Sequence, residues 1–391
     1  MASPPRIRVA LIGLSASAAT SWAARGHLPY LLSPRGLERF QIVTLCNSSV
    51  AAAHAAIAHY KLDPSVVHAH GDPASLAADA DVDLVVCNTR VDNHFPTIEP
   101  SVRAGKDVFC EWPLAENAGR AKQLVELAKE GGGRTVVGLQ GQLAPLGKRL
   151  RGLLEAGRIG RIFSVEVRAA GGMPERDALP ATLEYFTRLE VGGNMVTIGF
   201  GHLFDLVQSV VGEANSVHGH LHLQRPDMQL RDPATKAIVK TVRSDVPDLI
   251  VATGSVPESP LTQKGGAPLL VRFSRDPPFT GEPKVVWIIT GEKGEIRLTS
   301  HSTAFIALGP NEGGSIDIEV HDFETDNVTK VEWSWEDWQE ELPMTARNVG
   351  ALYEAFSQGE WCPTFEHALR RHEQLDGMLT EWKRGRLETS G

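Results

Sequence analysis

The sequence predicts an α/β protein with two domains, an N-terminal doubly wound parallel sheet and a C-terminal α+β domain with a largely antiparallel, open sheet. The first observation is length, since 391 residues exceed the roughly 150 of one ordinary domain. The second is that continuous apolar runs alternate with helical patterns as far as residue 145, which is typical of a parallel sheet covered on both faces. The third is that later strands alternate apolar with polar residues, as a half-exposed antiparallel sheet does. We therefore expect domains at residues 1–145 and 146–391.

In the first domain each element is placed by an apolar run or by helical spacing. Strands are expected at Ile7–Ile12, Gln41–Cys46, Leu84–Cys87, Asp107–Cys110 and Thr135–Leu139. Helices are expected at Ala18–Ala24, Val50–Tyr60, Phe95–Ala104 and Glu116–Glu130. The last helix has acidic residues early and a lysine late, as the helix dipole favours, and it stops at three consecutive glycines. Right-handed crossovers between such strands give the doubly wound arrangement.

The second domain starts with a helix at Pro145–Ala156, after which the pattern changes. Alternating strands are expected at Ile162–Ala169, His218–Leu223, Leu269–Phe273, Val285–Thr290 and Glu295–Thr299. Helices over residues 346–358 and 364–383 are expected to close the domain. The long links rich in proline, glycine and polar residues favour antiparallel pairing in this part of the chain.

Composition excludes several classes of protein. Hydrophobic residues make up 42% and charged residues 22% of the chain, which argues against disorder. The net charge is −9 and no run of Lys or Arg stands out, so nucleic acid and anionic membranes are not expected partners. No apolar run approaches the ~20 residues of a membrane span, and the N-terminus lacks a signal-peptide layout. We expect a soluble cytoplasmic protein.

No metal site is expected. The four cysteines form no CxxC pair and are expected to be reduced core thiols; they are Cys46, Cys87, Cys110 and Cys362. Three histidines recur at spacing two, at His218, His220 and His222. Because they lack neighbouring carboxylate or thiol ligands in the sequence, we expect a solvated or dimer-facing strand there.

The turn after the first strand resembles a dinucleotide-binding turn with two substitutions. Gly13-Leu14-Ser15-Ala16-Ser17-Ala18 fits a GxGxxG frame in which Ser15 and Ala18 replace the second and third glycines. A pyrophosphate needs exposed backbone N–H groups near a helix N-terminus, and small side chains leave that approach open. The candidate cofactor residues here are Gly13, Ser15, Ala16 and Ser17.

The end of the second strand bears on the choice between NAD and NADP. An NAD site usually presents a carboxylate to the ribose diol at this point. Here the strand ends in Cys46-Asn47-Ser48-Ser49, so nothing repels a 2′-phosphate and hydroxyl groups are available to bind it, although no adjacent Arg clamps it. We expect Asn47 and Ser48 to contact NAD(P), with a preference for NADP over NAD; the alternative is a plain Asn-Ser turn.

Several strings, in order, resemble the Gfo/Idh/MocA oxidoreductase family. They are Val9–Ala18, Ala104–Val108 continuing into Cys110–Leu114, and Gly192–Gly193 followed by Gly201, His202 and Asp205. Further strings resemble the fungal subgroup that includes the galactose-pathway transcriptional repressor of yeasts; they are Ser21–Ala23, His27–Pro29, Leu45–Ser49, Gly138–Gln142 and Thr197–Ile198. The resemblance spans residues 7 to about 383.

The family resemblance implies an N-terminal Rossmann domain and a C-terminal domain whose open sheet faces the nicotinamide on one side and often a second subunit on the other. A homodimer or higher oligomer is therefore expected. It also implies cofactor contacts from Asn88, Thr89, His94 and Glu111, with Trp112 beside them.

Two groups that the family uses for proton transfer are missing. Trp112 stands where the family has a lysine, and an indole cannot titrate near neutrality. Thr197 stands where the family has an aspartate, and one extra residue separates Gly199 from His202. The remaining candidate for proton exchange is His202, with Asp205 three residues later to fix its tautomer. Tyr185 is the third catalytic candidate, as a hydrogen-bond donor.

Two functions stay open at this point. The first is an NAD(P)-dependent oxidoreductase acting on a sugar, polyol or other small carbonyl or alcohol compound. The second is a non-catalytic dinucleotide sensor, cytoplasmic or nuclear, that binds a transcription activator. The sequence does not decide the substrate, the redox direction or the oligomeric state.

Overall fold

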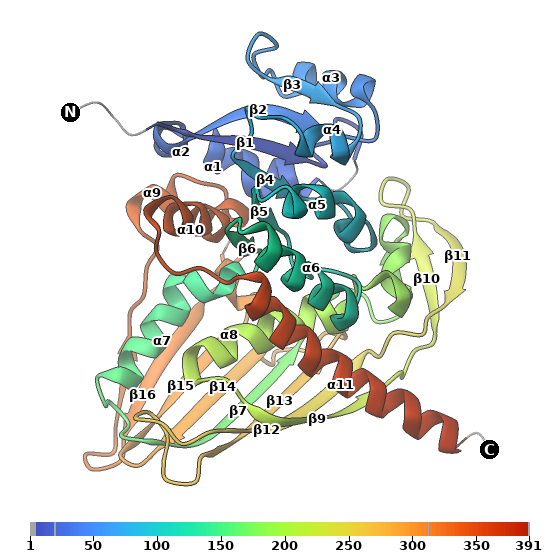
Figure 1. Ribbon diagram of the computed structural model, residues 1–391. Helices are drawn as coiled ribbons and strands as arrows, with labels where there is room; N and C mark the ends of the chain where they lie inside the picture. Colours follow the sequence, from blue (N-terminus) through green and yellow to red (C-terminus); the bar gives the residue numbers. More distant parts are fainter. Residues whose placement is uncertain (1–4, 19–20, 312, 390–391) are drawn as a thin grey trace. The chain divides into compact units, whose positions relative to one another are not determined.

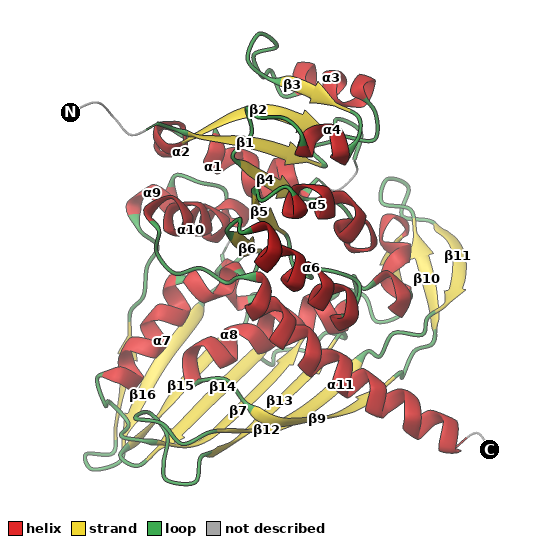
Figure 2. Cartoon of the chain, in the orientation of Figure 1, coloured by secondary structure: helices red, strands yellow, loops and turns green. Residues whose placement is uncertain are grey.

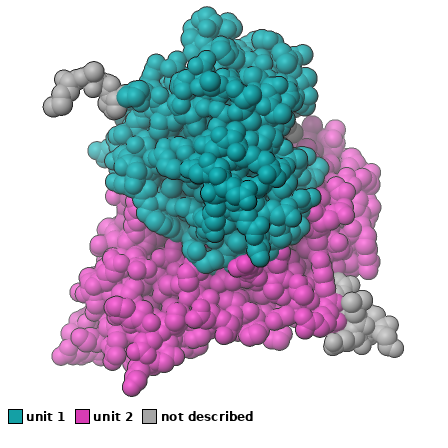
Figure 3. All heavy atoms as spheres, in the orientation of Figure 1, with its two compact units in different colours: residues 1–143, 335–372 teal, residues 144–334, 373–391 magenta. Residues whose placement is uncertain are grey.

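The computed structural model describes residues 5–18, 21–311 and 313–389, and the side chains as far as residue 385. The chain divides into two compact units, drawn in different colours in Figure 3. Unit 1 contains residues 1–143 and 335–372, and unit 2 contains residues 144–334 and 373–391. Among the described residues, no helix combines the length and the apolar character needed to cross a bilayer.

Unit 1 contains a six-stranded, all-parallel sheet with the order β3-β2-β1-β4-β5-β6 (Figure 1). Its strands are β1 (Ile7–Ile12), β2 (Phe40–Cys46), β3 (His68–His70), β4 (Leu84–Cys87), β5 (Asp107–Cys110) and β6 (Thr135–Val137). This order is that of a doubly wound dinucleotide-binding fold, so the predicted fold class is confirmed. β4 is short and apolar, and it is buried along its whole length because helices cover both faces of the sheet.

The helices of unit 1 follow the predicted alternation. They are η1 (Ala23–His27), α1 (Leu28–Leu31), α2 (Pro34–Arg39), α3 (Val50–His59), α4 (Pro73–Ala77), η2 (Val91–Asn93), α5 (His94–Arg103), α6 (Ala118–Gly131) and η3 (Gln140–Leu143). Side-chain caps fix several starts, and in α6 the Asn117 side chain accepts from the Arg120 amide. Gly132 ends α6 in the left-handed conformation, at φ +79°.

Residues from the C-terminal part of the chain complete unit 1. They form α9 (Asp337–Glu340), α10 (Met344–Gln358) and the start of α11 (Phe365–Thr389). Val349, Leu352 and Tyr353 of α10 are fully buried in the same apolar core as Val9 and Leu11 of β1. The expected division into 1–145 and 146–391 differs from this arrangement, because residues 335–372 return to the first unit. The physical reason is that one face of α10 is apolar and is buried against η1, α1 and η3.

Unit 2 is built on an eight-stranded sheet with the order β17-β16-β15-β14-β7-β13-β12-β9. Only β7 and β13 pair in parallel; the other neighbours are antiparallel, as predicted. The strands are β7 (Ile162–Ala170), β9 (Asn215–His222), β12 (Leu249–Val256), β13 (Ala267–Ser274), β14 (Val285–Gly291), β15 (Gly294–Ser300), β16 (Ile316–Asp322) and β17 (Asn327–Val331). A separate three-stranded sheet joins β8 (Ala178–Pro180), β10 (Asp227–Arg231) and β11 (Ile238–Arg243).

One face of the large sheet is covered by helices (Figure 2). They are α7 (Pro145–Glu155), α8 (Gly201–Val211) and the last part of α11, which Gln374 joins to Gln208 of α8. On β13 the buried Val271 and Phe273 alternate with the more exposed Leu270 and Arg272, so the second face is left open. Short helical turns complete the unit; they are η4 (Ala181–Thr187), η5 (Leu189–Val191), η6 (Met195–Phe200) and η7 (Ile306–Leu308).

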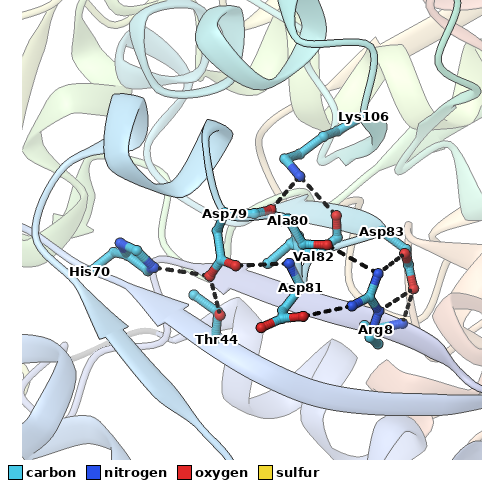
Figure 4. Close-up of polar contacts among 9 residues, drawn as sticks. All are labelled: Arg8, Thr44, His70, Asp79, Ala80, Asp81, Val82, Asp83 and Lys106. Carbon is cyan, nitrogen blue, oxygen red and sulfur yellow. Dashed lines mark hydrogen bonds and ion pairs between the residues drawn. The ribbon is translucent and has the colours of Figure 1, made fainter.

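An ion network joins the amino ends of β1, β4 and β5 (Figure 4). Arg8 donates to Asp83 from Nε at 3.0 Å and from Nη2 at 2.8 Å, and Nη1 reaches Asp81 at 2.9 Å. Lys106 donates to the carbonyl oxygens of Asp79 and Val82 at 2.6 and 2.8 Å. These contacts fix the edge of the sheet that is formed by the amino ends of the strands, opposite their carboxyl ends.

Hydrogen bonding from Arg8 lowers the pKa of the Asp83 carboxyl below its ordinary value. The unfolded chain therefore takes up more protons, so this contribution to stability is present above the ordinary pKa of about 4 and is lost as the pH falls through the lower folded value. We expect Asp83→Asn to lower the melting temperature at pH 7 and to differ less from wild type at pH 3. Thermal unfolding at both pH values tests this. Asp81→Asn, at a carboxylate 67% exposed, is the control with the smaller expected effect; an equal deficit of Asp83→Asn at both pH values would contradict the assignment.

Candidate functional site

The carboxyl ends of the strands in unit 1 lie at one level of the sheet. The register pairs Ile12 with Cys46 and with Cys87, and Cys87 with Cys110. The residues that follow these strand ends are therefore neighbours; they are Gly13, Asn47, Asn88 and Glu111. The strand order also reverses between β1 and β4, and ligands of doubly wound sheets bind in the crevice at such a reversal.

Gly13 lies against the end of β4 and leaves little space for a side chain. Its φ is +88°, and a Cβ here would lie 3.0 Å from the carbonyl oxygen of Asn88 and 3.3 Å from Cγ2 of Thr89. Both the backbone conformation and the close approach therefore require glycine. The turn predicted at this residue is present.

Residues 14–18, which follow Gly13, are not helical. The Tyr60 hydroxyl donates to the carbonyl oxygen of Ser15 at 2.9 Å, and the Ser17 amide donates to the Ser15 side chain at 3.2 Å. The helix expected at Ala18–Ala24 begins only at Trp22, where Oγ of Ser21 accepts from the Ala24 amide at 3.3 Å. Residues 19 and 20 lie outside the described residues. The partly exposed Ser15 and the exposed Ala16 and Ser17 thus belong to a loop and not to a helix start, which corrects the predicted geometry of the motif.

Asn47 and Ser48 lie at the end of β2 as expected. The side-chain amide of Asn47 donates from Nδ2 to the carbonyl oxygen of Leu14 at 2.9 Å. This hydrogen bond joins the end of β2 to the loop after β1. Ser48 is exposed, and the neighbouring Ser49 caps α3 by accepting from the Ala52 amide at 3.1 Å. Ser48 is therefore the more available of the two predicted side chains.

Asn88 is the most informative of the predicted residues. Its backbone amide donates to the carbonyl oxygen of Ile12 at 3.0 Å, which holds the residue beside Gly13. Both polar atoms of its side chain are buried, and neither has a hydrogen-bond partner among the described residues. Leaving a buried amide unpaired costs about 1–3 kcal/mol, so such a group calls for a partner outside the protein. The next residue, Thr89, has its hydroxyl 3.4 Å from the Cys87 sulfur.

His94 connects two loops of unit 1, and its predicted contact with the cofactor stays a prediction. It is buried, and its Nδ1 and Nε2 lie 2.9 Å from the carbonyl oxygens of Pro113 and Thr89, respectively. Both ring nitrogens are thus used to bridge the loops after β4 and β5. This placement makes His94 a support of those loops.

Glu111 belongs to a buried group that the sequence analysis missed. Its Oε1 lies 2.8 Å from Nε2 of His27, and Nδ1 of His27 lies 2.8 Å from the hydroxyl of Tyr353. His27 and Tyr353 are both 0% exposed. The only signal in the sequence was the string His27–Pro29, which carried the family resemblance without a role for the histidine.

Trp112 is packed inside unit 1, with 4% of its surface exposed. Its ring centroid lies 4.7 Å from that of His372 on α11. Burial, followed by the charge of His94, lowers the pKa of His372 to about 3, so this imidazole is neutral at physiological pH. Neither the indole nor this histidine can therefore replace a titrating lysine near neutral pH.

One group of metal-ligand types is found among the described residues, formed by Cys87, His94 and Cys110 within 4.8 Å of one another. Burial would raise the pKa of the Cys87 thiol, but hydrogen bonding with Cys110 and the charge of His94 lower it to about 6. Since both nitrogens of His94 already face backbone carbonyls, the imidazole has no lone pair directed at a metal. We therefore assign no metal to this group.

Thr197, where the family has an aspartate, caps a helix in unit 2. Its hydroxyl donates to the carbonyl oxygen of Gly192 at 2.6 Å and accepts from the Asn194 amide at 3.1 Å. The Asn194 side chain in turn accepts from the Val196 and Thr197 amides. The helix then makes a π-helical turn at Met195–Phe200 before α8, which accommodates the extra residue noted in the sequence.

The three predicted catalytic residues all lie in unit 2. His202 is partly exposed and Asp205 is 1% exposed, and both lie in the N-terminal half of α8. Tyr185 lies in η4, with its ring 5.0 Å from that of Phe186. His202 and Asp205 thus share one helix, and their roles in proton transfer stay predictions.

Two family models match the chain, and they divide it near residue 144. Residues 7–139 match the oxidoreductase family with an NAD-binding Rossmann fold, named GFO_IDH_MocA. Residues 145–300 match the C-terminal domain of Gal80p. The predicted resemblance is confirmed in both halves of the chain.

Individual relatives include both an enzyme and a regulator. The chain is 29% identical over 384 residues to dehydrogenase aclE of Aspergillus oryzae, covering 97% of each chain. Its structure resembles a super-repressor mutant of Gal80p from Saccharomyces cerevisiae, with a TM-score of 0.82, 23% identity and 97% of each chain covered. It also resembles levoglucosan dehydrogenase in complex with NADH and L-sorbose, with a TM-score of 0.71, 17% identity and 97% of each chain covered.

The geometry of Thr197 predicts a structural effect when its hydroxyl is removed. Thr197→Val keeps the shape but leaves the Gly192 carbonyl and the Asn194 amide without this partner, so we expect the free energy of unfolding to fall by about 2 kcal/mol. Thr197→Ser keeps the hydroxyl and serves as the control. Chemical denaturation of both variants measures the difference; a valine variant as stable as the serine variant would refute the capping role.

Proposed function

We propose that this chain, which matches the Gfo/Idh/MocA family over residues 7–139 and the Gal80p C-terminal domain over residues 145–300, is an NAD(P)-dependent oxidoreductase. Its substrate would be a sugar, a polyol or another small carbonyl or alcohol compound. The full-length similarity to a dehydrogenase supports an enzyme, and the complex of levoglucosan dehydrogenase with L-sorbose supports a sugar-like substrate.

The observation that carries the proposal is the unpaired amide of Asn88 beside Gly13. Asn88 offers a buried donor and a buried acceptor at the point where the strand order reverses. A dinucleotide lying across this edge would satisfy both groups, and it would face bare backbone at Gly13. Ser15, Ala16 and Ser17 would surround the pyrophosphate, with Asn47, Ser48, Thr89 and Glu111 as further contacts.

The bound nicotinamide would supply a hydride donor or acceptor, and the protein would supply orientation and the proton. Trp112 offers only an N–H donor and cannot exchange that proton. His202 is the residue proposed to do so, since an imidazole exchanges protons near neutral pH. Asp205 would fix its tautomer, and Tyr185 would donate a hydrogen bond to the substrate oxygen.

Cofactor preference, assembly and location complete this proposal. The end of β2 carries no carboxylate, which supports NADP over NAD. The open face of the large sheet supports a homodimer or higher oligomer, and the composition supports a cytoplasmic protein. No direct nucleic-acid partner is proposed.

The alternative function is a non-catalytic, dinucleotide-binding regulator that captures a transcription activator, in the cytoplasm or the nucleus. The match of residues 145–300 to the Gal80p C-terminal domain favours it, as does Trp112 at the position of the family's lysine. The two functions share the dinucleotide and differ in turnover.

Turnover separates the two functions. Purified protein is mixed with NADPH or NADH and a panel of aldoses, ketoses and other carbonyls, or with NADP+ or NAD+ and polyols, and absorbance at the reduced-nicotinamide band is followed. We expect turnover that falls at least about 100-fold in His202→Ala, the size typical of losing a general acid or base. Absence of activity above the variant on every substrate, together with capture of a nuclear activator in a pull-down with dinucleotide, would favour the regulator.

Dinucleotide binding is tested separately by calorimetry. We expect Asn88→Ala to weaken binding of either coenzyme about tenfold, because it removes two hydrogen bonds of roughly 0.5–1.5 kcal/mol each. Asn117→Ala, which removes the cap of α6, is a control expected to lower stability and leave affinity unchanged. A wild-type protein that binds neither coenzyme at millimolar concentration would contradict the whole proposal.

A further inference from the structure

Glu111, His27 and Tyr353 form a continuous buried chain of hydrogen bonds within unit 1. The two heavy-atom distances are both 2.8 Å, and the Glu111 side chain is 11% exposed, whereas His27 is 0% exposed. The three residues come from the end of β5, the end of η1 and the middle of α10. Such an arrangement holds a carboxylate in one orientation more firmly than solvent would.

Each of the three hydrogen-bonded residues has one role as donor or acceptor. An ionised carboxylate only accepts, so Nε2 of His27 carries the proton and donates to Oε1 of Glu111. In neutral imidazole Nδ1 then accepts, and the Tyr353 hydroxyl is its donor. Burial, followed by the charge of Glu111, raises the pKa of Tyr353 well above its ordinary value, so the phenol keeps its proton. Every proton of the chain is then used.

The phenol of Tyr353 is itself held by aromatic packing. Its ring stacks on Tyr30 with centroids 5.3 Å apart and planes 7° apart, and Phe40 and Phe109 contact its other sides at 5.2 and 5.3 Å. Tyr30 in turn donates to Glu354 at 2.8 Å. This cluster fixes the direction of the Tyr353 hydroxyl and, through it, the plane of the His27 ring.

The second oxygen of Glu111 is the one left for a ligand. Oε1 is the oxygen bound by His27, and Oε2 lies over Gly138, where a Cβ would collide with the carboxylate. The glycine therefore makes room for the carboxylate at the carboxyl edge of the sheet. His27 ends a π-helical turn, a feature found frequently at functional sites.

We propose that His27 and Tyr353 are positioning residues for Glu111: they bind Oε1 and thereby direct Oε2 toward a hydroxyl or amide donor of the bound dinucleotide. This inference rests on the proposed function, since it assigns to Glu111 a coenzyme contact. His27 and Tyr353, which are remote in sequence from Glu111, thereby become part of the proposed binding site. This role also distinguishes them from a merely structural cluster, because their effect must pass through one carboxylate.

The experiment measures Kd for NADH and NADPH by calorimetry in the full-length protein. We expect His27→Leu to raise Kd about tenfold, the size typical when the partner of a ligand-binding group is removed. Tyr353→Phe keeps the packing and removes only the hydroxyl, with an expected rise of about threefold. His27→Gln can still donate to Glu111 and should restore binding to within about twofold of wild type.

A double-mutant cycle shows whether the effect passes through Glu111. In a Glu111→Ala background we expect His27→Leu to cause no further loss of affinity, because the group that it positions is gone. Gly138→Ala should weaken binding with His27 intact, because it displaces the carboxylate. Asn117→Ala, which removes the cap of α6, is the control expected to lower the melting temperature and leave Kd unchanged.

The outcomes are distinct. A wild-type protein that binds no coenzyme overturns the proposed function and this inference with it. Wild-type binding with an unchanged Kd in His27→Leu, or the same loss in the Glu111→Ala background, overturns the inference alone. Long-range ¹H–¹⁵N NMR of His27 gives an independent reading, with the Nε2–H tautomer expected and the Nδ1–H tautomer contradicting the proposal.

Discussion

The structure of unit 1 depends on the parallel alignment of β1, β2, β4 and β5 with their carboxyl ends at one level. Backbone pairing sets this level, since the last residues of these strands are in register. Residues far apart in the chain thereby become neighbours, as Gly13 and Asn88 do. At this edge the strand order reverses, so the crevice and the polar groups that line it arise from the same constraint.

The groups at this edge divide into those that support it and those that are left for a ligand. His94 uses both ring nitrogens on backbone carbonyls, and Asn47 uses its amide nitrogen on the loop after β1. Asn88 has no such partner among the described residues, and Oε2 of Glu111 is the carboxylate oxygen that His27 does not bind. A supporting side chain can be replaced only by one that makes the same hydrogen bonds. Replacing a side chain that is left for a ligand can instead change which ligand is preferred.

The substitutions at Trp112 and Thr197 have different physical consequences. Thr197 pairs two backbone groups of the helix start, so its hydroxyl is used for stability. Trp112 fills a buried volume beside His372, which burial keeps neutral. Neither side chain can take up or release a proton near neutral pH. The proposed proton-transfer residues therefore lie on α8 in unit 2. For the same reason, an enzyme and a regulator are both consistent with the proposed coenzyme site.

The sequence by itself determined the elements and the chemistry of single positions. The apolar runs placed β4 and β5 to the residue, and the start of α3 was predicted equally well, because strand periodicity and capping depend on neighbours in the chain. The glycine turn at residue 13 was also identified from the sequence, as was Trp112 at the position where the family has a lysine. The late start of the helix after Gly13 was not, since its Ser21 cap lies in a run of small residues with no distinguishing pattern.

Only the tertiary structure decided which residues meet. α10 belongs to a segment that returns to the first unit after residues 144–334, and it places the Tyr353 hydroxyl against His27, 326 positions away. The bridge made by His94 and the unpaired amide of Asn88 likewise depend on what surrounds them. Periodicity reports which face of an element is apolar, but it contains no information on which other element that face will contact, and hydrogen bonds between distant segments follow from that choice alone.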